Sequence, residues 1–260
     1  MYEKRILVVD TETGGIGPDA HLKYSILQLG AVVWENGAEG ESFEALIREP
    51  VLMAQPEALI VNGITPQRLL NEGLDPEHVT EKFIQWLAHT AGYENVVYGS
   101  DKIILGGHNV GYDASFISRL FQLGKHEGYF EKLFSHRMID TASIARFLTL
   151  ARFLPERSAS SKSLFEHFGC KPNKPHDALS DAKATAKLLT EMLGLVRLHS
   201  PILLVAESPE KSIAYKEEVT RTPPLVPDTF RTPPIGPSPL NKFRDHCGDL
   251  ERSILERSKE

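Results

Sequence analysis

The chain has 260 residues, 41% of them hydrophobic and 25% charged, which is typical of a globular protein with one domain and an appendage or with two small domains. No stretch approaches the ~20 apolar residues that span a bilayer, which excludes an integral membrane protein. The N-terminus shows no signal-peptide pattern, and the two cysteines, Cys170 and Cys247, have neither zinc-site nor disulfide-scaffold spacing, so we expect a cytoplasmic location.

The net charge of −6 argues against a protein that holds long nucleic acid by bulk electrostatics. Residues 197–260 carry ten basic and ten acidic residues, so the whole excess lies on residues 1–196. An acidic domain can still act on nucleic acid where its carboxylates hold metal cations, because the ions reverse the local field.

Three strands are predicted near the N-terminus. Apolar runs at residues 4–10, 25–34 and 42–47 are typical of strands, and the turn signal Glu35-Asn36-Gly37 divides the second from the third. We therefore expect an antiparallel meander.

Helices and short strands alternate in the rest of the first 196 residues. Apolar side chains recur at helical spacing in residues 80–90, 112–123, 141–150, 164–168 and 177–193, and short strands are expected at 103–105 and 137–140. Ser163 is the expected cap of the fourth helix, and Gly194 the expected end of the fifth. The order predicts a mixed α/β sheet flanked by helices.

The last quarter of the chain has a different composition. Residues 221–240 hold seven of the 17 prolines, so residues 197–240 are predicted to be an extended, proline-rich linker. Two RTPP repeats, at 221 and 231, fit either a polyproline ligand for an aromatic groove or a plain spacer, and we favour the spacer. Residues 241–260 are expected to form a short amphipathic helix, and residues 221–260 are the expected contact for a protein partner.

Two acidic residues follow the first apolar run. Asp10 and Glu12 are two positions apart on the expected strand, so their side chains point to the same side. Two carboxylates that close repel each other unless a cation lies between them. Alone, however, such a pair is more often a solvated strand end.

Two later segments add acidic residues at the starts of expected helices. Asp113 lies in a first helical turn, where it could simply complement the helix dipole. Asp181 follows His176 by five residues, which is about 1.4 turns, so the two share no helix face. The pair can act together if His176 lies on the loop that enters the helix. The alternative is that Asp177 caps the helix and His176 is a surface residue.

Together and in this order, the three segments resemble the DEDDh exonucleases, the superfamily that includes the proofreading subunit of bacterial replicative DNA polymerase. The resemblance covers residues 4–194 and implies a ribonuclease-H-like sheet. It is supported by Gln28-Leu29-Gly30, by Asn62-Gly63-Ile64 and by Asp140-Thr141. Tyr112 replaces a common phenylalanine and Asn62 a common histidine.

The resemblance implies a two-metal mechanism that uses Mg²⁺ or Mn²⁺, hard ions that prefer oxygen ligands. Asp10 would bridge the ions, Glu12 and Asp181 would complete the first, and Asp113 would support the second. His176 would be the general base, since imidazole suits proton transfer near neutral pH.

Further residues are expected to contact the terminal nucleotide. The segment after the first motif supplies Thr11, Thr13 and Gly14, with glycine permitting close approach. A base could stack on Ile64 or Tyr112, whereas Leu29 is better explained as core. Asn109 is a further expected contact, and His108 is expected to be structural.

These observations favour a metal-dependent 3′–5′ exonuclease that acts on single-stranded 3′ ends, with DNA preferred in proofreading or repair. The alternatives are an RNA-trimming exoribonuclease on the same fold, and a non-enzymatic adaptor that binds through the fold and the proline tail. The filled set of five catalytic positions favours an enzyme.

Overall fold

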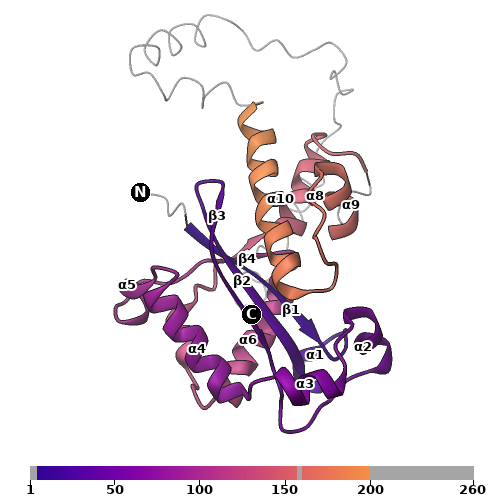
Figure 1. Cartoon of the computed structure of the whole chain (residues 1–260). Coiled ribbons are helices and arrows are strands. Elements are labelled where there is room, and N and C mark those ends of the chain that lie inside the picture. The colour runs from indigo at the N-terminus through magenta and orange to yellow at the C-terminus, as the bar shows by residue number, and fades with distance from the viewer. Residues whose placement is uncertain (1–4, 157–159, 199–260) are drawn as a thin grey trace, which may run out of the picture. The chain divides into compact units, whose positions relative to one another are not determined.

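The computed structural model describes residues 5–156 and 160–198, which form a five-stranded sheet flanked by helices (Figure 1). The strands are β1 (Arg5–Thr13), β2 (Ile26–Glu35), β3 (Ala38–Leu46), β4 (Leu105–Gly107) and β5 (Ile139–Asp140). The helices are α1 (Ala20–Lys23), α2 (Pro56–Asn62), α3 (Pro66–Glu72), α4 (Pro76–His89), α5 (Glu94–Val97), α6 (Gly111–Leu123), α7 (Tyr129–Leu133), α8 (Thr141–Leu150), α9 (Ser161–Phe168) and α10 (Ala178–Leu198). None of the helices in these residues is long and apolar enough to cross a membrane.

The sheet is mixed, as predicted. Its strand order is β3-β2-β1-β4-β5. The first three strands pair antiparallel, and β1–β4 and β4–β5 pair parallel. The expected meander and the mixed sheet are both confirmed, and β1 ends three residues beyond the expected strand, at Thr13.

Alternate residues of β1 supply two hydrophobic cores, one on each face of the sheet. Leu7 and Val9 pack in a large core with residues of α4 and α6. Ile6 and Val8 pack with Ala182 and its neighbours on α10. Helix α10 therefore covers one face, and α4 and α6 cover the other (Figure 1). Because β1 is central and buried on both faces, residues at its end are held rigidly.

The structure corrects several predicted helix boundaries. Helix α4 begins at Pro76, because Asp75 caps it by accepting a hydrogen bond from the His78 amide. The cap of α9 is Ser160 rather than Ser163, whose amide is the donor.

Helix α10 does not end before Gly194 but continues to Leu198. Glycine inside a helix costs only about 1 kcal/mol, and packing of Met192 and Leu195 against the core shared with α8 and α9 supports this last stretch. The predicted linker and C-terminal helix lie outside the described residues, apart from residues 197 and 198, which belong to α10.

Candidate active site

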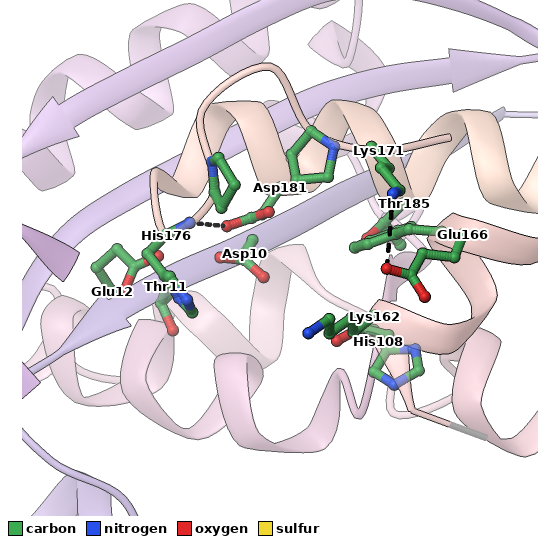
Figure 2. A pocket seen from close by; sticks show the side chains of 14 residues that line it. Asp10, Thr11, Glu12, His108, Lys162, Glu166, Lys171, His176, Asp181 and Thr185 are labelled. Atoms are coloured by element: carbon green, nitrogen blue, oxygen red, sulfur yellow. Dashed lines mark hydrogen bonds and ion pairs between the residues drawn. The ribbon is translucent and has the colours of Figure 1, made fainter. Parts of the chain in front are cut away.

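Three carboxylates from two elements meet at the end of β1. Asp10 and Glu12 lie two positions apart on the strand, and Asp181 comes from the first turn of α10. One oxygen atom of each lies within 4.8 Å of the others, an arrangement that can hold a metal ion (Figure 2). The predicted shared side of Asp10 and Glu12 is therefore confirmed, and α10 adds a third carboxylate.

The start of α10 approaches β2 closely because of two residues on that strand. The Gln28 side chain is buried and its Oε1 accepts a hydrogen bond from the Ala178 amide. A Cβ atom on Gly30 would lie 2.3 Å from the backbone of Ala178 and Leu179, so any larger residue would push the helix away. These two contacts place Asp181 beside Asp10.

His176 lies on the loop before α10, which is the position required for it to act together with Asp181. Its φ of 59° is in the left-handed region, which histidine adopts more readily than most residues. Its backbone amide donates to Oδ2 of Asp181 at 2.9 Å (Figure 2), which fixes the loop relative to the carboxylate. The His176 residue itself is exposed and lines the same cleft as the carboxylates. Asp177 caps the helix by accepting a hydrogen bond from the Ser180 amide at 3.2 Å, as the alternative interpretation of this segment predicted.

Asp113 enters the site from the other face of the sheet. It lies in the first turn of α6, is 5% exposed, and does not belong to the group of three. Its Oδ1 accepts hydrogen bonds from both the amide (2.9 Å) and the hydroxyl (2.8 Å) of Thr11, the residue between Asp10 and Glu12. Asp113 is thereby joined directly to the acidic strand end, which a residue serving only the helix dipole would not need.

Burial and mutual repulsion raise the pKa values of the site carboxyls. The pKa of Asp10 is well above its usual value, first because of burial and then because of the charge of Asp113. Burial and the charges of Asp181 and Asp113 raise the pKa of Glu12 to about 8. Burial raises the pKa of Asp113 to about 7 despite its bonds to Thr11, and it also raises that of Asp181. Such a group of oxygen donors fits hard divalent cations, which would relieve the repulsion.

The carboxylates form one side of a cleft of about 700 Å³. The opposite wall comes from α9 and the loop after it, and from His108 at the end of β4 (Figure 2). Sequence reasoning missed this wall. One missed lining residue could have been found, since Thr185 follows Asp181 by one helical turn. The α9 residues carried no such signal.

Comparison with known proteins matches most of the chain to one family. The exonuclease family RNase_T matches residues 7–189, well over half of the chain. The chain belongs to the exonuclease family. Exonucleases of this family typically use divalent metal ions, in agreement with the acidic cluster.

Curated relatives of this exonuclease are similar over about three quarters of its length. The 3′–5′ DNA exonuclease Cap18 of Escherichia coli is 30% identical over 72% of the chain and 90% of the relative. The DNA polymerase III epsilon subunit of Buchnera aphidicola is 27% identical over 74% of the chain and 72% of the relative. The PolC-type DNA polymerase III of Oceanobacillus iheyensis is 28% identical over 74% of the chain, but the chain spans only 12% of it.

Solved structures share the fold. Escherichia coli exonuclease I, in complex with a dT13 oligonucleotide, superposes with a TM-score of 0.60 at 18% identity, covering 82% of this chain and 46% of that one. The nuclease domain of 3′hExo, a DEDDh family member bound to rAMP, gives 0.57 at 17% identity, covering 74% and 93%. The resemblance to DEDDh 3′–5′ exonucleases and the ribonuclease-H-like fold are confirmed.

The structure gives three of the predicted substrate contacts other partners. The backbone amide and the hydroxyl of Thr11 both donate hydrogen bonds to Asp113. The amide of Gly14 donates to Ser25 and its carbonyl accepts from Gln55, while a Cβ there would lie 2.3 Å from the Met53 oxygen. Gly14 therefore admits a neighbouring loop of the exonuclease rather than a nucleotide. Ile64, at 1% exposure, is packed with Leu27 and Leu69, so it offers no face to a base.

Of the other three predicted contacts, Tyr112 and Asn109 keep accessible surface, whereas Thr13 is buried and its hydroxyl donates to the Gly15 carbonyl at 2.9 Å. Tyr112 is half-buried, and its hydroxyl donates to the Gly15 carbonyl at 2.7 Å. The Tyr112 hydroxyl also lies 3.0 Å from the Thr13 hydroxyl. Asn109 is exposed and has a φ of 60°, and its backbone amide donates to Oδ1 of Asp140. Leu29 is fully buried, as expected of a core residue.

In the absence of divalent metal, we expect the stability of the exonuclease to fall as the pH rises. A carboxyl whose pKa is raised on folding, such as Glu12 from 4.5 to about 8, keeps a proton in the folded state that the unfolded chain releases. The folded state is therefore favoured below pH 4.5 and loses this advantage up to pH 8. Melting temperatures in EDTA should fall across this window, and Mg²⁺ should raise them most at the alkaline end, by about 5 °C.

The matched variant for this measurement is Glu12→Gln, which is neutral at every pH. Its melting temperature in EDTA should depend less on pH than that of the wild type, and Mg²⁺ should raise this temperature less. Identical pH slopes for the two proteins would show that Glu12 does not hold a proton in the folded state.

Proposed function

We propose that this chain hydrolyses phosphodiester bonds from the 3′ ends of single-stranded nucleic acid, with DNA preferred, and releases nucleoside monophosphates. The observation that carries the proposal is the meeting of Asp10, Glu12 and Asp181 in one cleft with His176, with Asp113 joined to the same strand end. The relative Cap18, a 3′–5′ DNA exonuclease, supports DNA, and the polymerase relatives fit a role in replication or repair.

Two divalent ions, Mg²⁺ or Mn²⁺, would activate a water and stabilise the leaving oxygen of the scissile phosphate. Asp10 is the most central carboxylate and would contact both. Glu12 and Asp181, whose oxygens lie within 4.8 Å of it, would share the first. Asp113 has one oxygen engaged by Thr11, and its other oxygen would support the second.

His176 would take the proton from the attacking water. The hydrogen bond from the His176 backbone amide to Asp181 anchors the backbone of the loop. The exposed imidazole is free to turn towards the scissile phosphate. Tyr112, Thr13 and Asn109 would contact the terminal nucleotide, with the Tyr112 ring offering a face to its base.

The test is digestion of 5′-labelled oligonucleotides with Mg²⁺ or Mn²⁺. Single-stranded DNA with a free 3′ end should be shortened from that end, matched RNA should be digested more slowly, and the product should be nucleoside monophosphate. Oligonucleotides with a blocked 3′ end and circular single strands should resist. Cleavage of the circles would indicate an endonuclease, and faster digestion of RNA would overturn the DNA preference.

A further inference from the structure

The active-site cleft extends well beyond the carboxylates. Its far wall is built by α9, by the loop that follows it, and by His108. Apart from His176 on that loop, these residues take no part in the proposed chemistry, yet they enclose the same continuous space as Asp10 (Figure 2).

One side chain gives this wall its positive charge. Lys171 lies 3.5 Å from Glu166, so these two charges largely offset each other. His108 is not a strong cation, since burial lowers the pKa of its imidazole. Lys162 is exposed, lines the cleft, and has no ion-pair partner among residues 5–156 and 160–198. It is thus the cation that remains available to a ligand in the cleft.

The direction of the substrate strand follows from the proposed function, on which this step rests. The reacting phosphate lies at the carboxylates, and the terminal nucleotide lies beyond Glu12, towards Thr13 and Tyr112. The rest of the strand must leave on the opposite side. In Figure 2, Lys162 and His108 lie on the side of Asp10 away from Glu12.

We propose that Lys162 on α9 binds a backbone phosphate of the strand on the 5′ side of the scissile bond, in the part of the cleft walled by His108 and the Lys171–Glu166 pair. A lysine ammonium is suited to a single phosphate as a point charge, and such contacts add affinity without base specificity. Lys162 is therefore a binding residue for the retained strand rather than a catalytic residue.

Two substrates distinguish this role. A single-stranded DNA oligonucleotide carries phosphates upstream of the scissile bond, whereas the p-nitrophenyl ester of thymidine 5′-monophosphate carries none. Lys162→Ala should raise KM for the oligonucleotide by about five- to tenfold at low salt, with little change in kcat. It should leave hydrolysis of the ester unchanged. The dependence of log KM on log salt should become shallower by about 0.7, the value for one phosphate contact on a single strand.

Two further variants serve as controls. Lys162→Arg keeps the charge and should restore most of the oligonucleotide KM. Lys102→Ala removes an exposed lysine that bonds the Glu131 carbonyl and does not line the cleft, so it should leave both substrates unaffected.

An unchanged oligonucleotide KM in Lys162→Ala, or an equal loss on both substrates, would overturn the assignment. If the wild-type protein hydrolyses neither substrate, the proposed function itself fails and this inference fails with it. Failure of the Lys162 assignment alone would therefore be seen only in the variant, whereas failure of the proposed function would be seen in the wild type.

Discussion

Asp10→Asn should abolish digestion of single-stranded DNA, with a loss of at least about a thousandfold in kcat. Asn keeps the size of the side chain but removes the negative charge, so the site loses one of the three carboxylates whose oxygens lie within 4.8 Å of one another. The stability of the folded protein should not decrease. Burial and the charge of Asp113 already oppose ionisation of Asp10, so the neutral amide removes a repulsion. We expect the melting temperature in EDTA to be unchanged or higher.

The measurement is digestion of a labelled oligonucleotide alongside a melting curve. Asp101→Asn is the matched control, since Asp101 is exposed on a loop and lies outside the cleft. It should keep full activity. Normal digestion by Asp10→Asn would rule out the proposed role of the acidic cluster, whereas inactivity with a large drop in melting temperature would indicate a structural role.

His176→Asn should lower kcat by about 10²- to 10⁴-fold and leave KM for the oligonucleotide nearly unchanged. Asparagine tolerates the left-handed backbone of this position and keeps the amide that binds Asp181. The loop therefore retains its conformation, and only the group that would accept the proton is lost. Divalent metal should still raise the melting temperature of the variant.

His136→Asn provides the comparison, because His136 is exposed and does not line the cleft. It should behave as the wild type. If His176→Asn raised KM without lowering kcat, the histidine would be a substrate contact and another base would have to be sought.

Local patterns predicted most of the elements. Strand β2 and helices α6 and α8 were found within one residue at each end, because apolar runs and helical periodicity are properties of a single segment. The short helices α1, α2, α3, α5 and α7 were missed, since four to seven residues show too little periodicity to be distinguished from loops. The end of α10 was misplaced because packing of Leu195 outweighs the cost of Gly194.

The acidic residues of the candidate site could be found from the sequence, but which of the expected nucleotide contacts keep a free group could not. Asp10 and Glu12 share a side because strand geometry requires it. Whether a polar group is free depends on what packs against it. Gly14 is enclosed by residues 53–55, and Ile64 lies beneath Leu27 and Leu69, neither of which could be deduced from spacing.

The sequence by itself determined the kinds of chemical groups, their order along the chain and their positions within each strand or helix, because these depend on local backbone geometry. The tertiary structure alone decided which of these groups meet. Gln28 and Gly30 bring Asp181 to the acidic strand end, Thr11 joins Asp113 to it, and α9 closes the far side of the cleft. Such approaches depend on close packing between segments as far as 150 residues apart, and no periodic pattern encodes them.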